Sequence, residues 1–415
     1  MEPLSVAPML DVTDRHFRFL LRLITRRTRL YTEMIVANSL ARDGAGDFAR
    51  AALAHDDDGG PLAAQLGGCD PDVLEAAAAL CVERGGYDEI NLNCGCPSPR
   101  FCGGGAGAAA DVAAPTGEEY GARLMLDPAC AARAVRAIRR RVGHAASVSV
   151  KCRLGIAPSA DAAVAGADVP SYASLRAFVA EVERAGADTV VLHARAAVLE
   201  GLSTAQNRTV PPLRPARAHA LKRDFAGLRV VLNGGVATLD AAAAHLRAPW
   251  RAAEGDEGGD LPAVDGVMIG RAVWHQPWML RDADARFSSS SASRGAGAGG
   301  ARAASPASRR EVCERYLDYA EARRADDDAD ATCDALLARP LFYLFAGERG
   351  ARAFRRALND ATSSQRKRAG GACGGHEGAS LRERVQDALD AAGVPDDDAD
   401  ATRAASPVAC YDAPD

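Results

Sequence analysis

Short apolar runs rich in β-branched residues alternate with segments of helical hydrophobic spacing from the N-terminus to about residue 285. One helical segment begins Asp70-Pro71-Asp72, which places a capping aspartate before a proline in the first turn. This alternation predicts a (β/α)8 TIM barrel. A doubly wound open sheet is the rival, but no Gly-x-Gly-x-x-Gly follows the first run, so this alternative loses support. The eight expected strands are residues 4–9, 30–35, 61–66, 89–93, 147–153, 189–193, 229–233 and 265–269.

A second unit is expected after the barrel, which we place at residues 1–287. Residues 288–308 are rich in Ser, Gly, Ala and Arg and too poor in large apolar side chains to pack, so they predict a flexible linker. Helical apolar spacing returns over residues 309–360 and predicts a small all-α domain. Residues 361–415 are polar, and we expect a largely disordered tail with one amphipathic helix near 381–392. Within the barrel, residues 103–118 and 251–262 have the composition of inserted loops.

Composition narrows the class of protein. The chain has 415 residues, and no apolar run approaches the roughly 20 residues that a membrane helix requires. No signal peptide precedes the first expected strand, so we expect a soluble, cytoplasmic monomer, or an organellar protein if the N-terminus is truncated. The eleven cysteines are scattered singly, and only Cys94 and Cys96 are close. Because the sequence holds no Cys-x-x-Cys pair, we expect a reducing compartment and no metal site.

Charge is segregated along a chain whose net charge is −5. Arginines crowd residues 15–29 and residues 349–368, whereas aspartate runs occupy residues 56–58, 326–328 and 396–398. Solvated helix faces explain such runs in many proteins. Two basic clusters on an acidic chain also keep a polyanionic partner open.

Glycines and a cation follow the last two expected strands. In a parallel barrel the strand ends meet at the C-terminal face. Gly234 and Gly235 follow the seventh strand, and Gly270 and Arg271 follow the eighth, so both loops offer backbone N–H groups to an anion. A tight turn would explain one Gly-Gly by itself. The pairing of both loops predicts a phosphate site, because barrels frequently bind phosphate there.

Polar residues also stand at the ends of the third to sixth expected strands. They are Gln65, Asn93, Lys151 and His193. A lysine among apolar strand residues needs an anionic partner, and the N1/O2 edge of a reduced flavin is one. The two amides can form in-plane hydrogen bonds with a flavin ring or a uracil. The alternative is that these side chains only satisfy buried backbone groups. The number of polar strand ends beside a phosphate site favours a ligand.

Several longer motifs point to one family. The most specific is residues 201–213, with Gly-Leu-Ser, Asn-Arg and Pro-Pro-Leu; others are residues 5–16, 30–34, 65–68, 87–98, 150–156 and 269–271. These segments resemble the tRNA-dihydrouridine synthase family, within it the A-type subfamily that modifies the D-loop. The similarity covers nearly all of residues 4–285. It is fainter over residues 336–358, which resemble the family's helical tRNA-binding domain.

The resemblance implies an FMN-dependent enzyme that reduces a D-loop uridine, at position 20 or 20a, to 5,6-dihydrouridine. NADPH would reduce the flavin, which would give hydride to C6 of a flipped uridine while a cysteine protonates C5. Asn93 would orient the pyrimidine, and Tyr120, Arg208 and Arg339 would contact the tRNA. The implied FMN ligands are Pro8, Met9, Gln65, Lys151, His193, Asn233, Gly234, Gly235, Gly270 and Arg271.

The proton donor is where the chain departs from the pattern. The resemblance places the acid in a Gly-Ala-Cys-Leu-Met-like segment, and here Arg123 stands in the place of the cysteine. Arginine cannot serve, because a pKa above about 12 makes proton donation near neutral pH very slow. We expect Cys102 to be the acid, with Glu119 as the second candidate, and Cys94 and Cys96 to pack beneath the site.

Two other functions and one artefact stay open. Arg123 favours a catalytically impaired, flavin-bearing tRNA-binding protein. Another FMN barrel oxidoreductase, acting on a small molecule, is the nearest rival enzyme, and the motif at residues 201–213 argues against it. A mis-predicted exon over residues 103–118 would also produce the departure at the proton donor.

Overall fold

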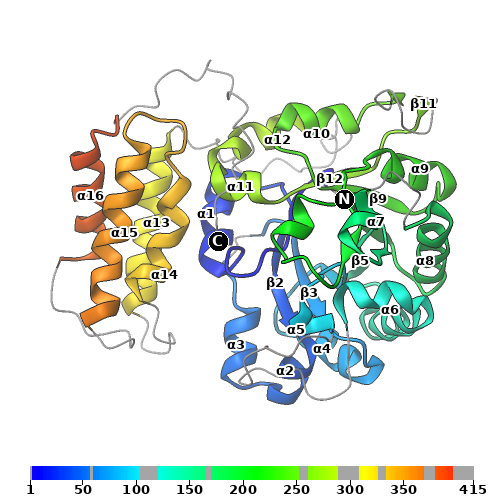
Figure 1. Ribbon diagram of the computed structural model, residues 1–415. Helices are drawn as coiled ribbons and strands as arrows, with labels where there is room; N and C mark the ends of the chain where they lie inside the picture. Colours follow the sequence, from blue (N-terminus) through cyan, green and yellow to red (C-terminus); the bar gives the residue numbers. More distant parts are fainter. Residues whose placement is uncertain are drawn as a thin grey trace, which may run out of the picture.

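The computed structural model describes residues 2–56, 59–102, 120–164, 170–251, 260–287, 308–325, 333–368 and 379–395. Figure 1 shows a barrel and, beside it, a separate group of helices, α13 to α16. Residues 288–307 of the expected linker, the inserted loop at 103–118 and most of the one at 251–262 lie outside the described residues.

Eight parallel strands form the barrel, and each falls on a run that was expected to be a strand. Their order around the sheet is β1-β12-β9-β7-β5-β4-β3-β2. Arg29, just before β2, closes the ring: it accepts from the N–H of Val6 at 2.9 Å and donates to the carbonyl of Leu4 at 3.1 Å. The (β/α)8 prediction is therefore confirmed. The strands are β1 (Leu4–Val6), β2 (Leu30–Val36), β3 (Leu62–Gly67), β4 (Glu89–Cys94), β5 (Ser147–Arg153), β7 (Thr189–His193), β9 (Arg229–Asn233) and β12 (Gly266–Ile269).

Helices cover the outside of the strands and begin at caps that the sequence indicates. The side chain of Asp70 accepts backbone N–H groups at the start of α4 (Pro71–Glu83), and Asp127 does the same for α6 (Pro128–Val142). Proline in the first turn suits both helices, because its missing N–H would have no partner there. The other helices of the barrel are α1 (Arg15–Ile24), α2 (Ala37–Asp43), α3 (Asp47–Leu53), α5 (Pro99–Cys102), η2 (Gly121–Leu126), α7 (Ala160–Val164), α8 (Tyr172–Arg184), η3 (Gln206–Arg208), α9 (Ala216–Asp224), α10 (Leu239–His245), α11 (Arg271–His275), η4 (Pro277–Asp282) and α12 (Ala283–Arg286).

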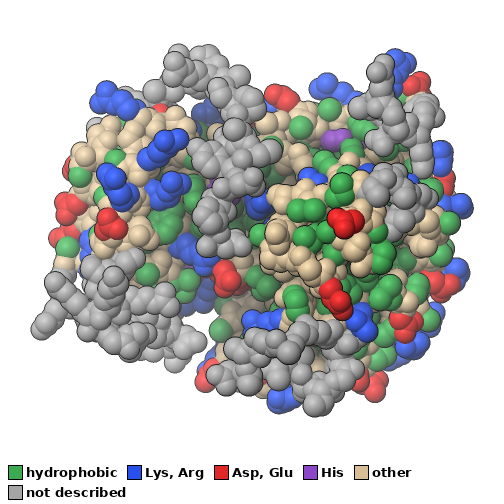
Figure 2. All heavy atoms as spheres, viewed as in Figure 1, with side chains coloured by type: hydrophobic (Ala, Val, Ile, Leu, Met, Phe, Trp, Pro, Cys, Tyr) green, Lys and Arg blue, Asp and Glu red, His purple; other side chains and the backbone are tan. Residues whose placement is uncertain are grey.

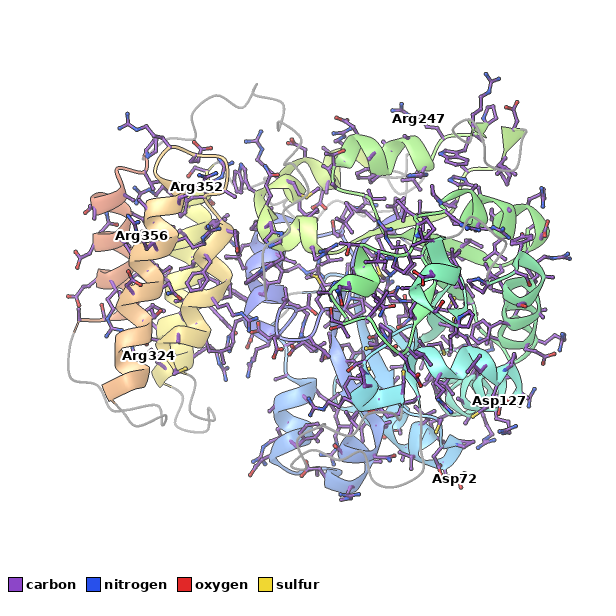
Figure 3. The ribbon with its side chains drawn as sticks, in the orientation of Figure 1. Asp72, Asp127, Arg247, Arg324, Arg352 and Arg356 are labelled. Carbon is purple, nitrogen blue, oxygen red and sulfur yellow. The ribbon has the colours of Figure 1, made fainter. Side chains whose placement is uncertain are left out.

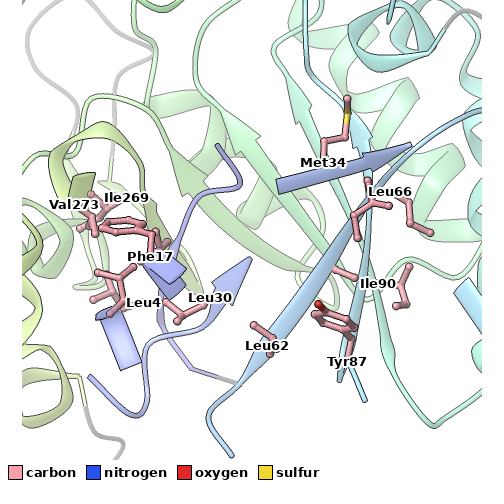
Figure 4. Close-up of a cluster of buried hydrophobic side chains, with 14 of the residues drawn as sticks. Leu4, Phe17, Leu30, Met34, Leu62, Leu66, Tyr87, Ile90, Ile269 and Val273 are labelled. Carbon is pink, nitrogen blue, oxygen red and sulfur yellow. The ribbon is translucent and has the colours of Figure 1, made fainter. Parts of the chain in front are cut away.

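The main hydrophobic core lies between the strands and these helices. Leu30, Leu62 and Ile90, from three neighbouring strands, belong to it together with Phe17 of α1 (Figure 4). Because successive side chains of a strand point to opposite faces, the alternate residues line the inside of the barrel. A smaller apolar cluster fills part of that inside: Ala7, Tyr31, Ala63, Val191, Val231 and Met268. The rest of the inner face is polar, and it carries the candidate site.

The helical unit is larger than the sequence indicated. Residues 309–360 were expected to form it, but α15 (Ala351–Arg368) runs past this boundary, and α16 (Leu381–Ala392) buries Leu381, Val385 and Leu389. Arg382 of α16 also donates to three carboxylates of α13 (Arg309–Ala325). The expected helix in the tail is therefore part of the packed unit, because its apolar face completes the core of the unit. The unit also contains α14 (Asp334–Ala338) and η6 (Arg339–Tyr343).

The helical unit packs on α1 and on the segment after β12. The ring of Tyr319 in α13 stacks on Phe19 with centroids 3.9 Å apart, and its hydroxyl lies 2.9 Å from Nδ1 of His16. At the other end of the contact, the rings of Tyr343 and Trp274 pack edge to face, with their centroids 5.4 Å apart. We call this contact the junction. It fixes the helical unit against the barrel by aromatic packing and hydrogen bonds.

The sequence predicts neither a membrane-spanning helix nor a metal site. Within the part of the chain that the structure describes, no helix is both long and apolar enough to cross a membrane. Nor do the described residues bring three or more His, Cys, Asp or Glu side chains together in a group that could hold a metal ion.

Candidate active site

The predicted strand-end residues lie on neighbouring strands at the C-terminal mouth of the barrel. Asn93 of β4 pairs in register with Lys151 of β5, and His193 of β7 pairs with Asn233 of β9. Gln65 lies on β3, which pairs with β4. Residues in register on parallel strands point to the same face. The fold therefore brings together side chains that are up to 168 residues apart in the sequence (233 minus 65).

Asn93 and Gln65 form a buried amide pair. Nδ2 of Asn93 donates to Oε1 of Gln65 at 2.8 Å, and Oδ1 of Asn93 accepts the N–H groups of Gly95 and Cys96, both at 3.0 Å. The backbone N–H of Gln65 donates to the hydroxyl of Thr32, at a bulge in β2. The sequence predicted both amides but not their contact. Asn93 consequently also sets the course of the loop that leaves β4.

Positive charge concentrates beside the amide pair. Burial is the main cause that lowers the pKa of Lys151 to about 8, and the nearby Arg153 lowers it further. Burial and then Arg153 and Lys151 hold the pKa of His193 well below 6.5, so its imidazole is neutral. Within the described residues, no carboxylate is among the groups that shift either pKa. The mouth therefore favours an anionic ligand, which would offset the desolvated lysine.

Arg153, which sequence reasoning did not select, anchors this region. Its guanidinium donates to the carbonyls of Gly95 at 2.9 Å, Ala196 at 3.0 Å and Asn207 at 2.9 Å. Burial lowers its pKa to about 10. The side chain thus ties together three loops at the mouth and adds charge to it. Its position at the C-terminal end of β5, two residues after Lys151, was the available signal.

The glycines predicted to bind phosphate lie where three strand ends meet. Gly234 has φ +98°, and a Cβ there would approach the ring of His193 to 2.5 Å. Gly235 has φ +73°, and a Cβ there would collide with Leu213. A side chain at either position would therefore displace His193 or Leu213. Gly270, at the start of α11, would have its Cβ 3.8 Å from Sδ of Met9, so the ends of β1 and β12 are adjacent.

The residues around these glycines have distinct positions. Arg271 is exposed and begins α11, whereas Asn233 donates to the carbonyl of Met268 and so serves the backbone of β12. The helix that follows Gly235, α10, begins at Leu239 with Thr238 as its cap, and residues 236–238 form a connecting segment. Pro8 and Met9 are half-buried after β1. The predicted set is thus assembled, and α11 is the helix whose first turn lies at it.

Cys102, the expected acid, has a buried environment. Only 2% of the residue is exposed, and its Sγ lies 3.2 Å from the carbonyl oxygen of Cys96 and 3.3 Å from that of Tyr120, which share its one hydrogen. Burial raises its pKa to about 11. Because both hydrogen bonds end on backbone, the thiol holds η2 to the loop after β4. The second candidate acid, Glu119, lies outside the described residues.

Cys96 is the thiol that lies at the mouth. It follows Asn93 by three residues and is partly exposed, whereas Cys94 is fully buried. Burial raises the pKa of Cys96, while a hydrogen bond from Ser98 N–H and the charges of Arg153, Lys151 and Arg208 lower it. The expectation that both cysteines pack beneath the site was therefore wrong for Cys96. The loop position directly after a strand end was the signal that could have found it.

The three predicted tRNA contacts do not form one cluster. Tyr120 is buried, stacks on Phe101 at 5.4 Å and lies against Gly67 at the end of β3. Arg208 lies close enough to His193 to lower its pKa. Arg339 belongs to the helical unit, where its guanidinium lies 5.6 Å from the ring centroid of Trp274 at the junction. Tyr120 and Arg208 thus flank the mouth, and Arg339 is separate from it.

The two basic clusters of the sequence differ in how far the described side chains are buried. In the first, Arg22 donates to the carbonyls of residues 25, 26, 28 and 61, and Arg18 donates to those of residues 13 and 54, so these side chains are structural. The second contains Arg352 and Arg356, which are exposed on α15 (Figure 3). Figure 2 shows further Lys and Arg side chains over this part of the molecule. The second cluster is therefore the better candidate surface for a polyanion.

The fold and this mouth define a class of protein: a (β/α)8 barrel with a polar, positively charged ligand site at the C-terminal ends of its strands. The model of the dihydrouridine synthase (Dus) family matches residues 5–110 and 112–374. The chain belongs to this family. The match extends through α15, so it includes most of the helical unit as well as the barrel.

Individual relatives agree with the family. The chain is 40% identical over 357 residues to a tRNA-dihydrouridine(20/20a) synthase of Xanthomonas axonopodis, covering 86% of this chain and 88% of the relative. It is 44% identical over 288 residues to the enzyme of that name from Pseudomonas putida, covering 69% and 72%. The corresponding protein of Synechocystis is 37% identical over 362 residues, covering 87% and 90%. The matches to the Xanthomonas and Synechocystis proteins, over 357 and 362 residues, are longer than the barrel of residues 1–287.

Proposed function

We propose that this chain is an FMN-dependent tRNA-dihydrouridine synthase that reduces a D-loop uridine, at position 20 or 20a, with NADPH as the reductant. One observation carries the proposal. Two hydrogen-bonded amides, Asn93 and Gln65, lie on the same strand-end ring as a buried lysine and a neutral histidine. Such a ring offers in-plane hydrogen bonds and a positive charge together, which suits a flavin ring and a pyrimidine.

The residues of the mouth fit a flavin mononucleotide. Lys151 is desolvated, and the anionic edge of a flavin would offset the cost of its charge. Gly234 and Gly235 adopt positive φ and bring the backbone against His193 and Leu213, and Gly270 and Arg271 add N–H groups and a cation for the phosphate. Bound FMN would supply the hydride for C6 of the uracil. Pro8 and Met9, after β1, would complete the binding site.

The chain's own acid, in this proposal, is Cys96. Its raised pKa keeps the thiol protonated, so it holds a proton to give to C5 of the uracil. Arg153, Lys151 and Arg208 would stabilise the thiolate that remains. Asn93 holds the loop through the N–H of Cys96 and would orient the pyrimidine with its amide. Cys102, whose thiol is bound to two carbonyls, would support this loop.

Binding of tRNA would extend from the mouth to the helical unit. Arg208 and Tyr120 flank the mouth, and Arg339 lies at the junction. Arg271 of α11 and Arg355 of α15 each lie near His275, whose pKa both lower after burial does. Exposed arginines recognise RNA mainly through phosphate charge and shape. The charged path from Arg271 along α15 would therefore carry the tRNA backbone.

The test is dihydrouridine formation in unmodified tRNA with NADPH. We compare the unchanged chain with Cys96→Ala, Cys102→Ala and Glu119→Gln. Loss of a general acid lowers the rate by about 10²- to 10⁴-fold, and we expect this loss for Cys96→Ala alone, with tRNA binding retained. Cys102→Ala should reduce thermal stability while each folded molecule keeps most of its activity. A larger loss of activity in Cys102→Ala than in Cys96→Ala would contradict the assignment.

The same experiment distinguishes the rival functions. Absence of product from the unchanged chain, with flavin and tRNA both bound, would favour the catalytically impaired tRNA-binding protein. If tRNA neither binds nor stimulates oxidation of the reduced flavin, the chain would be an FMN oxidoreductase acting on a small molecule. Visible absorbance of bound flavin tests the cofactor in all three cases.

A further inference from the structure

A line of hydrogen bonds runs inside the barrel from the mouth to its opposite end. Its members are Asn93, Gln65, Asn91, Ser149 and Glu89, and each is at most 8% exposed. From the mouth downward, each side chain donates to the next, at 2.8, 2.7, 2.7 and 2.5 Å. The line ends on the carboxylate of Glu89, the first residue of β4. It thus joins the two amides of the candidate site to an acid four residues below Asn93.

The carboxylate sets the direction of the lower end. An ionised carboxylate only accepts hydrogen bonds. Oε2 of Glu89 pairs with Nε of Arg29 at 3.3 Å, and Oε1 accepts from the hydroxyl of Tyr31 at 2.5 Å. Burial, followed by Glu89, raises the pKa of Tyr31 well above 10, so the phenol keeps its proton. Ser149 therefore donates its single hydroxyl hydrogen to this end of the line, to Glu89 or to the neighbouring oxygen of Tyr31. In both cases its own oxygen accepts from Asn91.

This direction is passed on to the mouth. Because Nδ2 of Asn91 faces Ser149, its Oδ1 faces Nε2 of Gln65. Oε1 of Gln65 then accepts from Nδ2 of Asn93, and Oδ1 of Asn93 accepts two backbone N–H groups. Carboxamide orientations are ordinarily assigned from their surroundings. Here a carboxylate at one end and backbone donors at the other require the same orientation, and reversing any one amide would oppose donor to donor and acceptor to acceptor.

We propose that Glu89 is a remote positioning residue, which fixes the amide orientations of Gln65 and Asn93 and thereby the loop that carries Cys96. The proposal rests on the proposed function, in which these amides contact the flavin and the pyrimidine. A ring edge with a set pattern of donors and acceptors binds an amide in only one orientation. A line with one direction leaves Gln65 and Asn93 each with one N–H to present to a ligand.

The test compares Glu89→Gln with Tyr31→Phe and Ser149→Ala. The glutamine has the same shape but can donate to Ser149, so the line is free to reverse. Tyr31→Phe removes another hydroxyl from the same carboxylate and leaves the line intact, so it is the matched control. Ser149→Ala cuts the line without touching the pair of Glu89 and Arg29, and it serves if Glu89→Gln fails to fold.

Two measurements are made on each variant. The first is the dissociation constant of FMN for the flavin-free protein, with the fine structure of the bound flavin spectrum. For Glu89→Gln and Ser149→Ala we expect the dissociation constant to increase about three- to tenfold, which corresponds to the loss of one net hydrogen bond. The spectrum of the bound flavin should also shift in both variants. The second is hydrogen exchange at the amides of Gly95 and Cys96 without ligand. Exchange there should be faster in these two variants and unchanged in Tyr31→Phe.

The outcomes separate the two proposals. Equal effects of Glu89→Gln and Tyr31→Phe on both measurements would overturn the positioning role, because the carboxylate would then matter only for packing. Unchanged exchange at residues 95 and 96 in Ser149→Ala would overturn it as well. If the unchanged protein binds FMN but forms no dihydrouridine, or binds no FMN, the proposed function fails. The exchange measurement would still decide the role of Glu89.

Discussion

The mouth of the barrel and the junction with the helical unit both combine arginines with aromatic or amide side chains, but their charges are balanced differently. At the junction, Asp56 binds Arg15 at 2.9 Å and accepts from Tyr319 at 3.0 Å, and Glu348 pairs with Arg309 at 2.8 Å. At the mouth, no described carboxylate is among the groups that shift the pKa of Lys151. A region whose charges are balanced internally serves structure, whereas one with unbalanced buried charge is prepared for a ligand.

Among the substitutions that test this difference between the mouth and the junction, Lys151→Met should have the largest effect. It removes the desolvated charge, so we expect FMN affinity to fall about 100-fold, the cost of losing one partner of a buried ion pair. The flavin-free protein should melt at a higher temperature than the unchanged one at pH 7, because an unbalanced buried charge no longer opposes folding. Flavin titration and thermal unfolding measure the two effects. A destabilised apoprotein would show that Lys151 is already balanced within the chain.

The second prediction concerns His16 at the junction and pH. Burial, then Arg15, lowers its pKa from 6.5 to about 4. Between these values the unfolded chain binds the proton and the folded chain does not, so the free energy of unfolding falls as pH decreases through this window. His16 by itself should lower the free energy of unfolding at pH 5 by about 2 kcal/mol relative to pH 7.

Denaturant unfolding at pH 7 and pH 5 measures this loss. His16→Asn keeps a donor for the hydroxyl of Tyr319 but does not titrate, so the difference between the two pH values should be about 2 kcal/mol smaller in this variant than in the unchanged chain. The same pH dependence in His16→Asn as in the unchanged chain would assign the effect to other groups.

Asp56→Asn should destabilise the junction, where the charges are balanced within the chain. The change removes the negative charge and one of the two acceptor oxygens shared by Arg15, Tyr319 and Arg323, and we expect the free energy of unfolding to fall by about 1–2 kcal/mol. The control is the same substitution at Asp47, whose pair with Arg50 is exposed and should contribute less than about 0.5 kcal/mol. FMN affinity should not change in either variant. A loss of FMN affinity in Asp56→Asn would show that the junction and the mouth are coupled.

The smallest expected effect is on the outer surface. Arg356→Gln removes one exposed charge of α15, so tRNA binding should weaken severalfold at low salt, and the slope of log affinity against log salt should fall by about one. Arg184→Gln is the control, because Arg184 is exposed on α8 and pairs with Glu181. Filter binding across a salt series measures both. Equal weakening by the two variants would mean that net charge alone, and no path along α15, governs tRNA affinity.

Several parts of the barrel could be predicted from the sequence because the information is local. Alternating apolar runs, the caps at Asp70 and Asp127 and the glycines at 234 and 235 each act within a few residues. The polar strand ends could be grouped because a parallel barrel places all of them at one face. The sequence could not show contacts between distant segments: the carbonyls of residues 96 and 120 that surround the thiol of Cys102, and the packing of α16 against α13 and α15.

The sequence by itself determined the barrel, the residues of its mouth and the resemblance to the dihydrouridine synthase family, because strand periodicity and motif spacing are properties of the chain order. Only the tertiary structure decided which arginines of residues 15–29 are buried against carbonyls, and which of Cys96 and Cys102 reaches the mouth. It also decided that Glu89 is joined to Asn93 through three intervening side chains. Burial and hydrogen-bond direction depend on partners from several strands, and no single segment of the sequence contains them.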